Sequence, residues 1–159
     1  MPHVSEAASW ADLEAADPDL AARGRALLEA SGHGTGLLAT VREGVPPRIH
    51  PMSVEIVDGH LLTVALGGSA KARDLEADGR YALHAHQDPS KPDEFQVRGR
   101  ARVLPPGELR DKAVAHWHFE VSPEDLVVEL AIEHALLGQR ASADDWPPAY
   151  RSWRPPATT

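Results

Sequence analysis

The clearest alternation of apolar and polar side chains runs through EFQVRGRARVL, residues 94–104. Here Phe95, Val97, Ala101 and Val103 alternate with Gln96, Arg98, Arg100 and Arg102. A period of two is typical of a β-strand with one face in the core and the other in water. The segment therefore predicts a strand whose wet face is basic.

Other short, β-friendly segments lie between turn signals. They are TGLLATVR at 35–42, a run at about 48–57, HLLTVAL at 60–66 and RYALHAHQD at 80–88. Gly and Pro at 43–47 predict a hairpin connection, and Asp58-Gly59 is a strong two-residue turn signal. The apolar run at 126–137 also fits a helix on periodicity alone, but its β-branched residues favour a strand.

Helical signals separate some of these strands. Asp17-Pro18 fits the start of a helix that ends at Gly32, and Ser69 fits the cap of a short helix that ends near Gly79. A third helix is expected where Leu109, Ala113 and Trp117 recur at helical spacing. The tail at 141–159 is too rich in proline for regular structure and is expected to be extended.

About six strands with helices between only some of them indicate a mainly β protein, an antiparallel barrel with peripheral helices. A chain of 159 residues fits a single domain, 1–159, with 1–16 as an N-terminal extension.

Composition narrows the function classes. A net charge of −8 disfavours a nucleic-acid partner, since the sequence has no local basic patch to offset it. With no cysteine, the chain has no disulfide, thiolate zinc site or cysteine nucleophile. The sequence has neither a leader pattern nor an apolar run of the ~18 residues that a membrane span needs. We therefore expect a cytoplasmic protein with no membrane partner.

Candidate chemistry begins at GGSAKARDL, residues 67–75, where a flexible turn opens into a helix. Free N–H groups at a helix N-terminus attract anions, and Ser69 and Lys71 would add a charge-assisted grip on a phosphate. An ordinary capped helix with solvated cations fits the same spacing. The segment lacks the pattern of a Walker loop, so it does not support nucleotide triphosphate hydrolysis.

The second candidate segment is RIHPMS, residues 48–53, at the start of a predicted strand. Pro51 removes one ladder donor, which indicates an edge, a bulge or a bend at a functional site. Arg48 by itself fits an ordinary surface residue.

Taken in order, these segments resemble the cofactor-binding half of the FMN-binding split-barrel family, which includes pyridoxamine 5'-phosphate oxidase. The series is an arginine followed by Pro-Met-Ser, then LLTVAL, then Ser-x-Lys-x-x-Asp-Leu, then RYALHAH. The tail RSWRPP is similar to the family's C-terminal segment, so the resemblance covers residues 18–156. It implies a six- to seven-stranded antiparallel split β-barrel with Greek-key character.

The resemblance also implies a site. Arg48, Ser69 and Lys71 would hold the FMN phosphate, while Pro51, Met52, Ser53, Val64 and Ala65 would line the isoalloxazine ring. Trp153 and Arg154 would close over the site from the other subunit of a homodimer that binds its cofactor at the interface. Ala70 stands where the pyridoxamine phosphate oxidases usually carry arginine, so no pyridoxamine phosphate substrate is assigned.

The function expected on this basis is that of an FMN-dependent oxidoreductase acting on an unknown small molecule. Related split barrels leave three alternatives open: a reductase that uses the deazaflavin coenzyme F-420, a protein that binds FMN or haem without turnover, and a scaffold without a cofactor. The catalytic residues are left unassigned.

The histidines and tryptophans fit structural roles. His84 and His86 share one face of a predicted strand, but no partners that would complete a metal site are evident, so none is assigned. His116 and His118 lie two apart on a predicted helix and are expected to point in different directions. Trp10, Trp117 and Trp146 are interpreted as core or interface aromatics.

Overall fold

The computed structural model describes residues 7–157. Its elements follow the chain in this order: α1 (Trp10–Ala16), α2 (Pro18–Leu28), β1 (Thr35–Arg42), β2 (Val45–Val57), β3 (His60–Ala65), α3 (Ala70–Ala77), β4 (Arg80–His84), β5 (Glu94–Val103), α4 (Glu108–His116), β6 (Leu126–Gln139) and β7 (Ala149–Trp153). None of the helices within these residues is long and apolar enough to cross a membrane.

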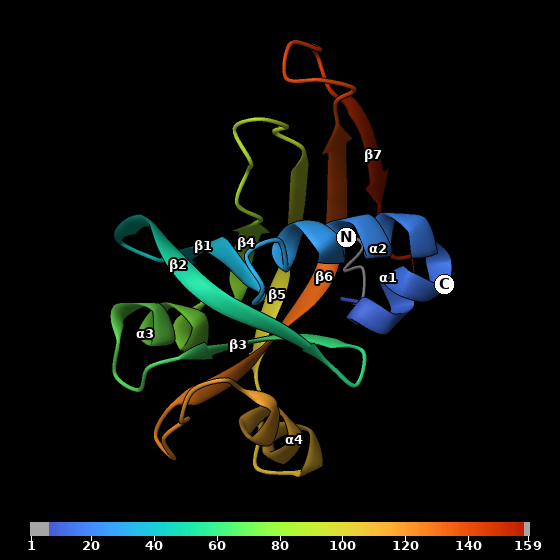
Figure 1. Cartoon of the computed structure of the whole chain (residues 1–159). Helices are drawn as coiled ribbons and strands as arrows, with labels where there is room; N and C mark the ends of the chain where they lie inside the picture. The colour runs from blue at the N-terminus through green and yellow to red at the C-terminus, as the bar shows by residue number, and fades with distance from the viewer. Residues whose placement is uncertain (1–6, 158–159) are drawn as a thin grey trace.

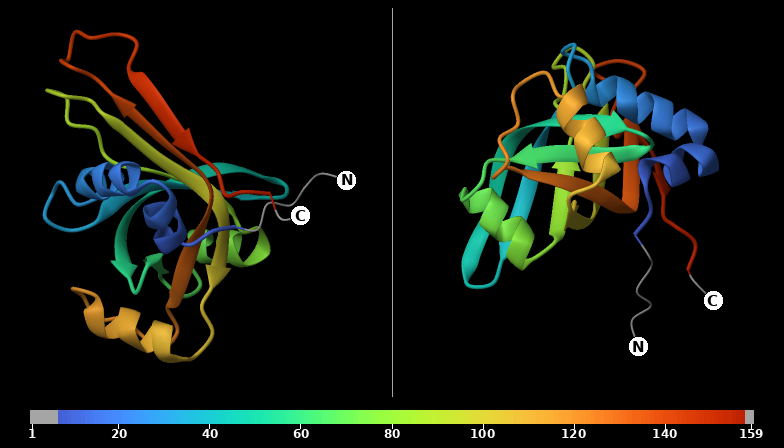
Figure 2. Two further views of the ribbon diagram at one scale, coloured as in Figure 1. Left: turned by 90° about the vertical axis from the view of Figure 1, so that its right-hand side faces the viewer. Right: turned by 90° about the horizontal axis from the view of Figure 1, so that it is seen from below.

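Six strands form an antiparallel barrel. They are hydrogen-bonded in the order β3-β2-β1-β4-β5-β6, and a further pairing of β3 with β6 closes the ring. The long β6 continues past the barrel, where β7 pairs with residues 135–139 (Figure 1). Figure 2 shows helices only at the periphery of this barrel, so the predicted mainly β architecture is confirmed.

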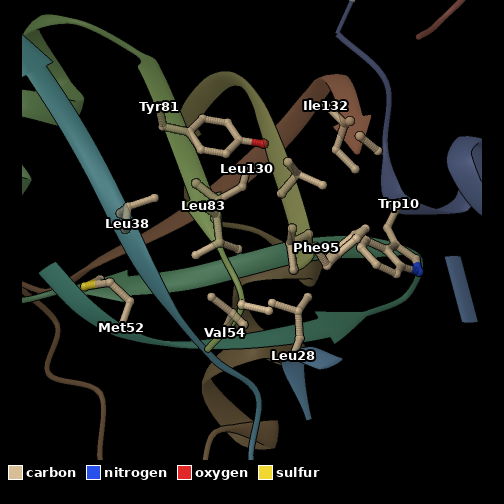
Figure 3. Close-up of a cluster of buried hydrophobic side chains, with 14 of the residues drawn as sticks. Trp10, Leu28, Leu38, Met52, Val54, Tyr81, Leu83, Phe95, Leu130 and Ile132 are labelled. Atoms are coloured by element: carbon tan, nitrogen blue, oxygen red, sulfur yellow. The ribbon is translucent and has the colours of Figure 1, made fainter. Parts of the chain in front are cut away.

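The barrel interior is the main core. Figure 3 shows large apolar side chains from the strands and from α1 and α2 converging there, including Leu38, Leu83, Phe95 and Leu130. A second cluster lies under α4 and contains Leu62, Val64, Leu104, Ala113, Trp117 and Val127. The barrel wall therefore presents its outer face both to α4 and to solvent.

Local signals placed most elements correctly. The strand at 35–42, the Asp17 cap, the Ser69 cap and the turn at Asp58-Gly59 all occur as predicted. The run from 126 is a strand and not a helix.

The hairpin before β2 is shorter than predicted. The strand begins at Val45, so Pro46 and Pro47 lie inside it and only residues 43–44 make the turn. The β1–β2 register shifts between Thr40 and Arg42, and the two prolines fall beside this irregularity. Proline is tolerated there because the sheet's hydrogen-bond ladder is interrupted at a bulge, so the N–H group that proline lacks is not needed.

The prediction of an irregular tail was wrong for β7. Prolines flank Ala149–Trp153 at 147–148 and 155–156, and the five residues between them keep the N–H groups that pair with β6. The predicted N-terminal extension contains α1, which is held by a capping box between Ser9 and Asp12; its first six residues lie outside the described part of the chain.

Two side-chain expectations also need correction. Trp10 and Trp117 are buried, but Trp146 is 70% exposed and stacks under Arg140. His116 and His118 do not diverge, since α4 ends at His116 and the extended Trp117 turns the chain so that both rings face Glu55, at 3.5 and 3.8 Å.

Candidate functional site

The predicted phosphate site lies at the N-terminus of α3. The Ser69 hydroxyl accepts the N–H of Ala72 at 3.2 Å, so this residue caps the helix as predicted. By helix geometry, the N–H groups of Ala70 and Lys71 have no carbonyl partner within α3. The turn before the cap places Gly68 at φ +73, a left-handed conformation that favours glycine. Local sequence thus builds a helix start able to receive an anion.

Arg48 reaches α3 from β2 through the carboxylate of Asp74, a residue that the sequence alone did not identify as part of the site. Its Nη1 lies 2.7 and 2.8 Å from the two carboxylate oxygens of Asp74, a residue whose side chain is almost fully buried. Thr40 donates to the same carboxylate at 2.9 Å, and the Arg42 Nε lies 3.2 Å from it. Asp74 therefore positions Arg48 beside α3.

Burial alone would raise the pKa of Asp74. Hydrogen bonds from Thr40 and Arg48, together with the charges of Arg48 and Arg42, outweigh burial and hold this pKa below its ordinary value. Asp74 is thus ionised at neutral pH and compensates one of the positive charges around it.

Lys71 adds a further cation at the start of α3. Among residues 7–157 its ammonium group makes no ion pair, and its charge acts on the neighbouring His50. Burial, Lys71 and Arg48 lower the pKa of His50 against the opposing effect of Asp74, and its Nε2 lies 3.1 Å from the Thr40 hydroxyl. Arg42 and Arg48 share the Asp74 carboxylate, and Lys71 lies near the same group through His50, so the three cations exceed the one carboxylate that compensates them.

The residues expected to line the ring do not share one surface, because some are buried and others lie on the outer face of β2. Met52 and Ala65 are buried in the barrel core, and Val64 is buried in the cluster under α4. Pro51 is exposed and pairs with Leu37 on β1, while Ser53 pairs with Thr35. The Ser53 hydroxyl is buried and has no hydrogen-bond partner among the residues that the structure describes. Pro51 is therefore the exposed residue of this segment, and Ser53 lies on the same outer face of β2 with its hydroxyl buried.

Trp153 and Arg154 are not brought to α3 in the same chain. Figure 1 shows β7 on the opposite side of the barrel from α3. Trp153 pairs with Ala135 and is half-buried against the core, and Arg154 is exposed. Any contact of these two residues with the α3 site would require a second copy.

A cavity of about 530 Å³ adjoins the outer face of β1. Its lining consists of Leu27, Ala30, Ser31, Thr35, His86, Gln87 and Asp88. Thr35 also pairs with Ser53, so the cavity begins where the predicted ring-binding segment ends.

The histidine clusters do not form a metal centre. No group of three or more His, Cys, Asp or Glu side chains within 7–157 is arranged to hold a metal ion. The His84 Nδ1 lies 2.6 Å from the Ala85 carbonyl, and His86 lies in the loop after β4.

A family model described as pyridoxamine 5'-phosphate oxidase matches residues 21–137. The chain belongs to the pyridoxamine 5'-phosphate oxidase family. The match spans β1 to β6 almost completely and so covers the whole barrel. No curated protein matches the chain.

Solved structures share the fold of this family. A haem-binding protein from Mycobacterium smegmatis is 17% identical with a TM-score of 0.63, and the match covers 84% of this chain and 57% of that one. HutZ, a haem storage protein from Vibrio cholerae, is 15% identical with a TM-score of 0.59, covering 74% and 89%. PhzG from Burkholderia lata, solved with tetrahydrophenazine-1-carboxylic acid, is 14% identical with a TM-score of 0.56, covering 89% and 96%. At these identities the likeness shows the fold alone.

Proposed function

We propose that this member of the pyridoxamine 5'-phosphate oxidase family binds FMN and acts as a flavin-dependent oxidoreductase on a small molecule. The observation that carries the proposal is the set of three cations beside α3: Arg42 and Arg48 pair with Asp74, and Lys71 lies in the first turn of the helix. A phosphate monoester carries close to two negative charges at neutral pH. These would balance the positive charge that remains after Asp74 compensates one of the three cations.

The residues of the chain have separate roles in this proposal. Lys71 and the free N–H groups of Ala70 and Lys71 hold the phosphate, the Ser69 hydroxyl keeps its proton available to donate, and Arg48 is positioned by Asp74. FMN would supply hydride or electron transfer, so the protein needs to contribute orientation and access. The outer face at Pro51 and Ser53 would support the ring, and the adjoining cavity would admit the substrate.

A second copy completes the proposed site. Ile49 is 70% exposed and Leu37 is 39% exposed, and with Pro51 they form an apolar strip on the outer face of β1 and β2. Exposed apolar side chains that cluster on one face are typical of an interface. Pairing of two chains through this strip would allow Trp153 and Arg154 of one copy to approach the α3 site of the other.

Haem binding is the second candidate. Two proteins of similar fold support it, one described as a haem-binding protein and the other as a haem storage protein. A deazaflavin such as coenzyme F-420 would use the same phosphate site, and its acidic tail would need further cations.

The experiment combines absorption spectra with matched variants. The purified protein titrated with FMN is expected to acquire flavin bands, and Lys71→Ala to bind FMN at least tenfold more weakly, since one charged hydrogen bond contributes about 1.4 kcal/mol or more. Arg80→Ala is the control, because it removes the same charge beyond the other end of α3, where Arg80 pairs with Asp78.

Three outcomes would contradict the proposal. A Soret band on addition of haem with no FMN binding would favour the second candidate, and a deazaflavin band alone would favour coenzyme F-420. An unchanged FMN dissociation constant in Lys71→Ala would show that the phosphate lies elsewhere.

A further inference from the structure

Three basic side chains form one row on the outer face of the barrel, away from α3. Arg98 on β5 pairs directly with His134 on β6. Trp153 pairs with Ala135, so Arg154, the next residue along, continues the register beside His134. Directly paired residues of neighbouring antiparallel strands have Cβ atoms about 5 Å apart. The row therefore places one guanidinium group on each side of the His134 imidazole.

The outward direction of this row follows from the alternation in β5. Phe95 and Val97 are buried in the barrel core, which places Gln96 and Arg98 on the opposite face. Arg98 and Arg154 are both exposed.

Carboxylates compensate the neighbouring arginines of β5 but not this row. Arg100 lies 3.5 Å from Glu133, and Arg102 is paired with the buried Glu129. Within the part of the chain that the structure describes, the side chains of Arg98, His134 and Arg154 make no hydrogen bond or ion pair. Glu133, the acidic residue next to His134, is the partner of Arg100.

His134 shows the consequence of this arrangement. Its Nδ1 is buried and has no hydrogen-bond partner among residues 7–157. Burial lowers the pKa of His134, and the positive charges of Arg154 and Arg98 lower it further. Like charges that converge around an unpartnered buried nitrogen would be stabilised by an anion.

We propose that Arg98, His134 and Arg154 bind the carboxylate or phosphate group of a small molecule. The planar guanidinium fork matches both oxyanions and binds them through paired N–H donors. Ala82 pairs with Arg98 on one side, and Leu136 follows two residues after His134, and both are half-buried. These apolar neighbours suit a ligand whose anionic group is attached to an apolar or aromatic body.

Within one chain the row is separate from the proposed flavin site, although the proposed dimer would bring Arg154 of one copy near the α3 site of the other. The row lies on β5, β6 and the end of β7, whereas the phosphate cluster lies on β2 and α3, on the other side of the barrel in Figure 1. The chain would therefore bind an anionic ligand at this row in addition to any cofactor phosphate.

The test is a titration of the full chain with benzoate and, separately, with inorganic phosphate, following the His134 ring resonances by NMR. We expect saturable shifts with at least one probe. Arg98→Ala and Arg154→Ala should each weaken binding about tenfold or more. Arg25→Ala should leave the affinity unchanged, because this arginine lies on α2, which packs against the other face of β5, and is paired with Glu29.

Tighter binding of benzoate would identify carboxylic acids as the ligands, and tighter binding of phosphate would identify phosphorylated molecules. The inference is overturned if neither probe saturates, or if Arg25→Ala weakens binding as much as Arg98→Ala. Repeating the titration with FMN present separates the two proposals. Displacement of both probes by FMN would mean that these cations belong to a flavin site, and the separate site would be wrong.

Discussion

At the scale of single residues, the candidate site depends on how one buried carboxylate is shared. Asp74 accepts hydrogen bonds from Thr40 and Arg48 and lies against Arg42. Removing one partner of a buried ion pair is costly because the remaining charge is left uncompensated. Lys71, which has no such partner in the described chain, is therefore the cation that a bound phosphate would engage first.

His50 leads to a pH prediction. Burial, Lys71 and Arg48 lower its pKa in the free protein, and a bound phosphate dianion would raise it again. His50 then binds a proton more readily in the FMN-bound protein than in the free protein. Protonation of His50 should therefore strengthen FMN binding as the pH falls from the pKa of His50 in the bound protein to its pKa in the free protein. The gain is up to about tenfold for each unit by which the pKa rises.

The measurement is FMN affinity by fluorescence between pH 8 and 5.5, in the wild type and in His50→Gln. Protonation of the phosphate itself, with a pKa near 6, acts in the opposite direction and is common to both proteins. The wild type should therefore gain affinity relative to the variant as the pH falls. Parallel pH profiles would show that His50 is not coupled to the phosphate.

At the scale of elements, the contact between α2 and the barrel depends on one glycine. Gly24 is buried in α2, and a Cβ at this position would lie well inside van der Waals contact of the Phe95 ring. Phe95 is itself buried and packs edge-on against Trp10. The helix approaches β5 this closely because residue 24 has no side chain.

Gly24→Ala tests this packing. Helix propensity alone would stabilise the variant by about 0.5–1 kcal/mol, whereas overpacking a core costs about 1–3 kcal/mol. We expect a net loss of stability of ~1–2 kcal/mol, measured by urea unfolding. Ala26→Gly, at an exposed position of the same helix, is the control that isolates propensity. A more stable Gly24→Ala variant would show that Phe95 moves aside freely.

At the scale of the whole molecule, the apolar strip on β1 and β2 is left uncovered in a single chain. Ile49 and Leu37 lie on this outer face, although the strands around them bury a complete core. A second copy of the chain is the proposed occupant.

Ile49→Glu should therefore shift the protein from dimer to monomer, because a charge would be buried in the apolar contact. Light scattering coupled to size exclusion measures the mass. Phe119→Glu is the control, since Phe119 is 41% exposed within an aromatic cluster beside α4. A wild-type monomer, or a dimer that survives Ile49→Glu, would contradict the proposed interface.

The sequence by itself determined the features that depend on neighbouring residues. Alternation predicted β5, Asp17 and Ser69 predicted helix caps, and Asp58-Gly59 predicted the turn between β2 and β3. These signals lie within a few residues of the structure they specify, so they can be interpreted without knowing the rest of the fold. The ordered series of motifs also indicated the family to which the chain belongs.

Only the tertiary structure decided which distant residues meet. The closure of β3 on β6, the pairing of β7, the contact of Arg48 with Asp74 across 26 residues, and the row of Arg98, His134 and Arg154 all depend on register between remote segments. A local pattern specifies which face of a strand is apolar, but not which strand lies beside it. That choice is made by the shared core and by the sheet's need to pair its backbone groups.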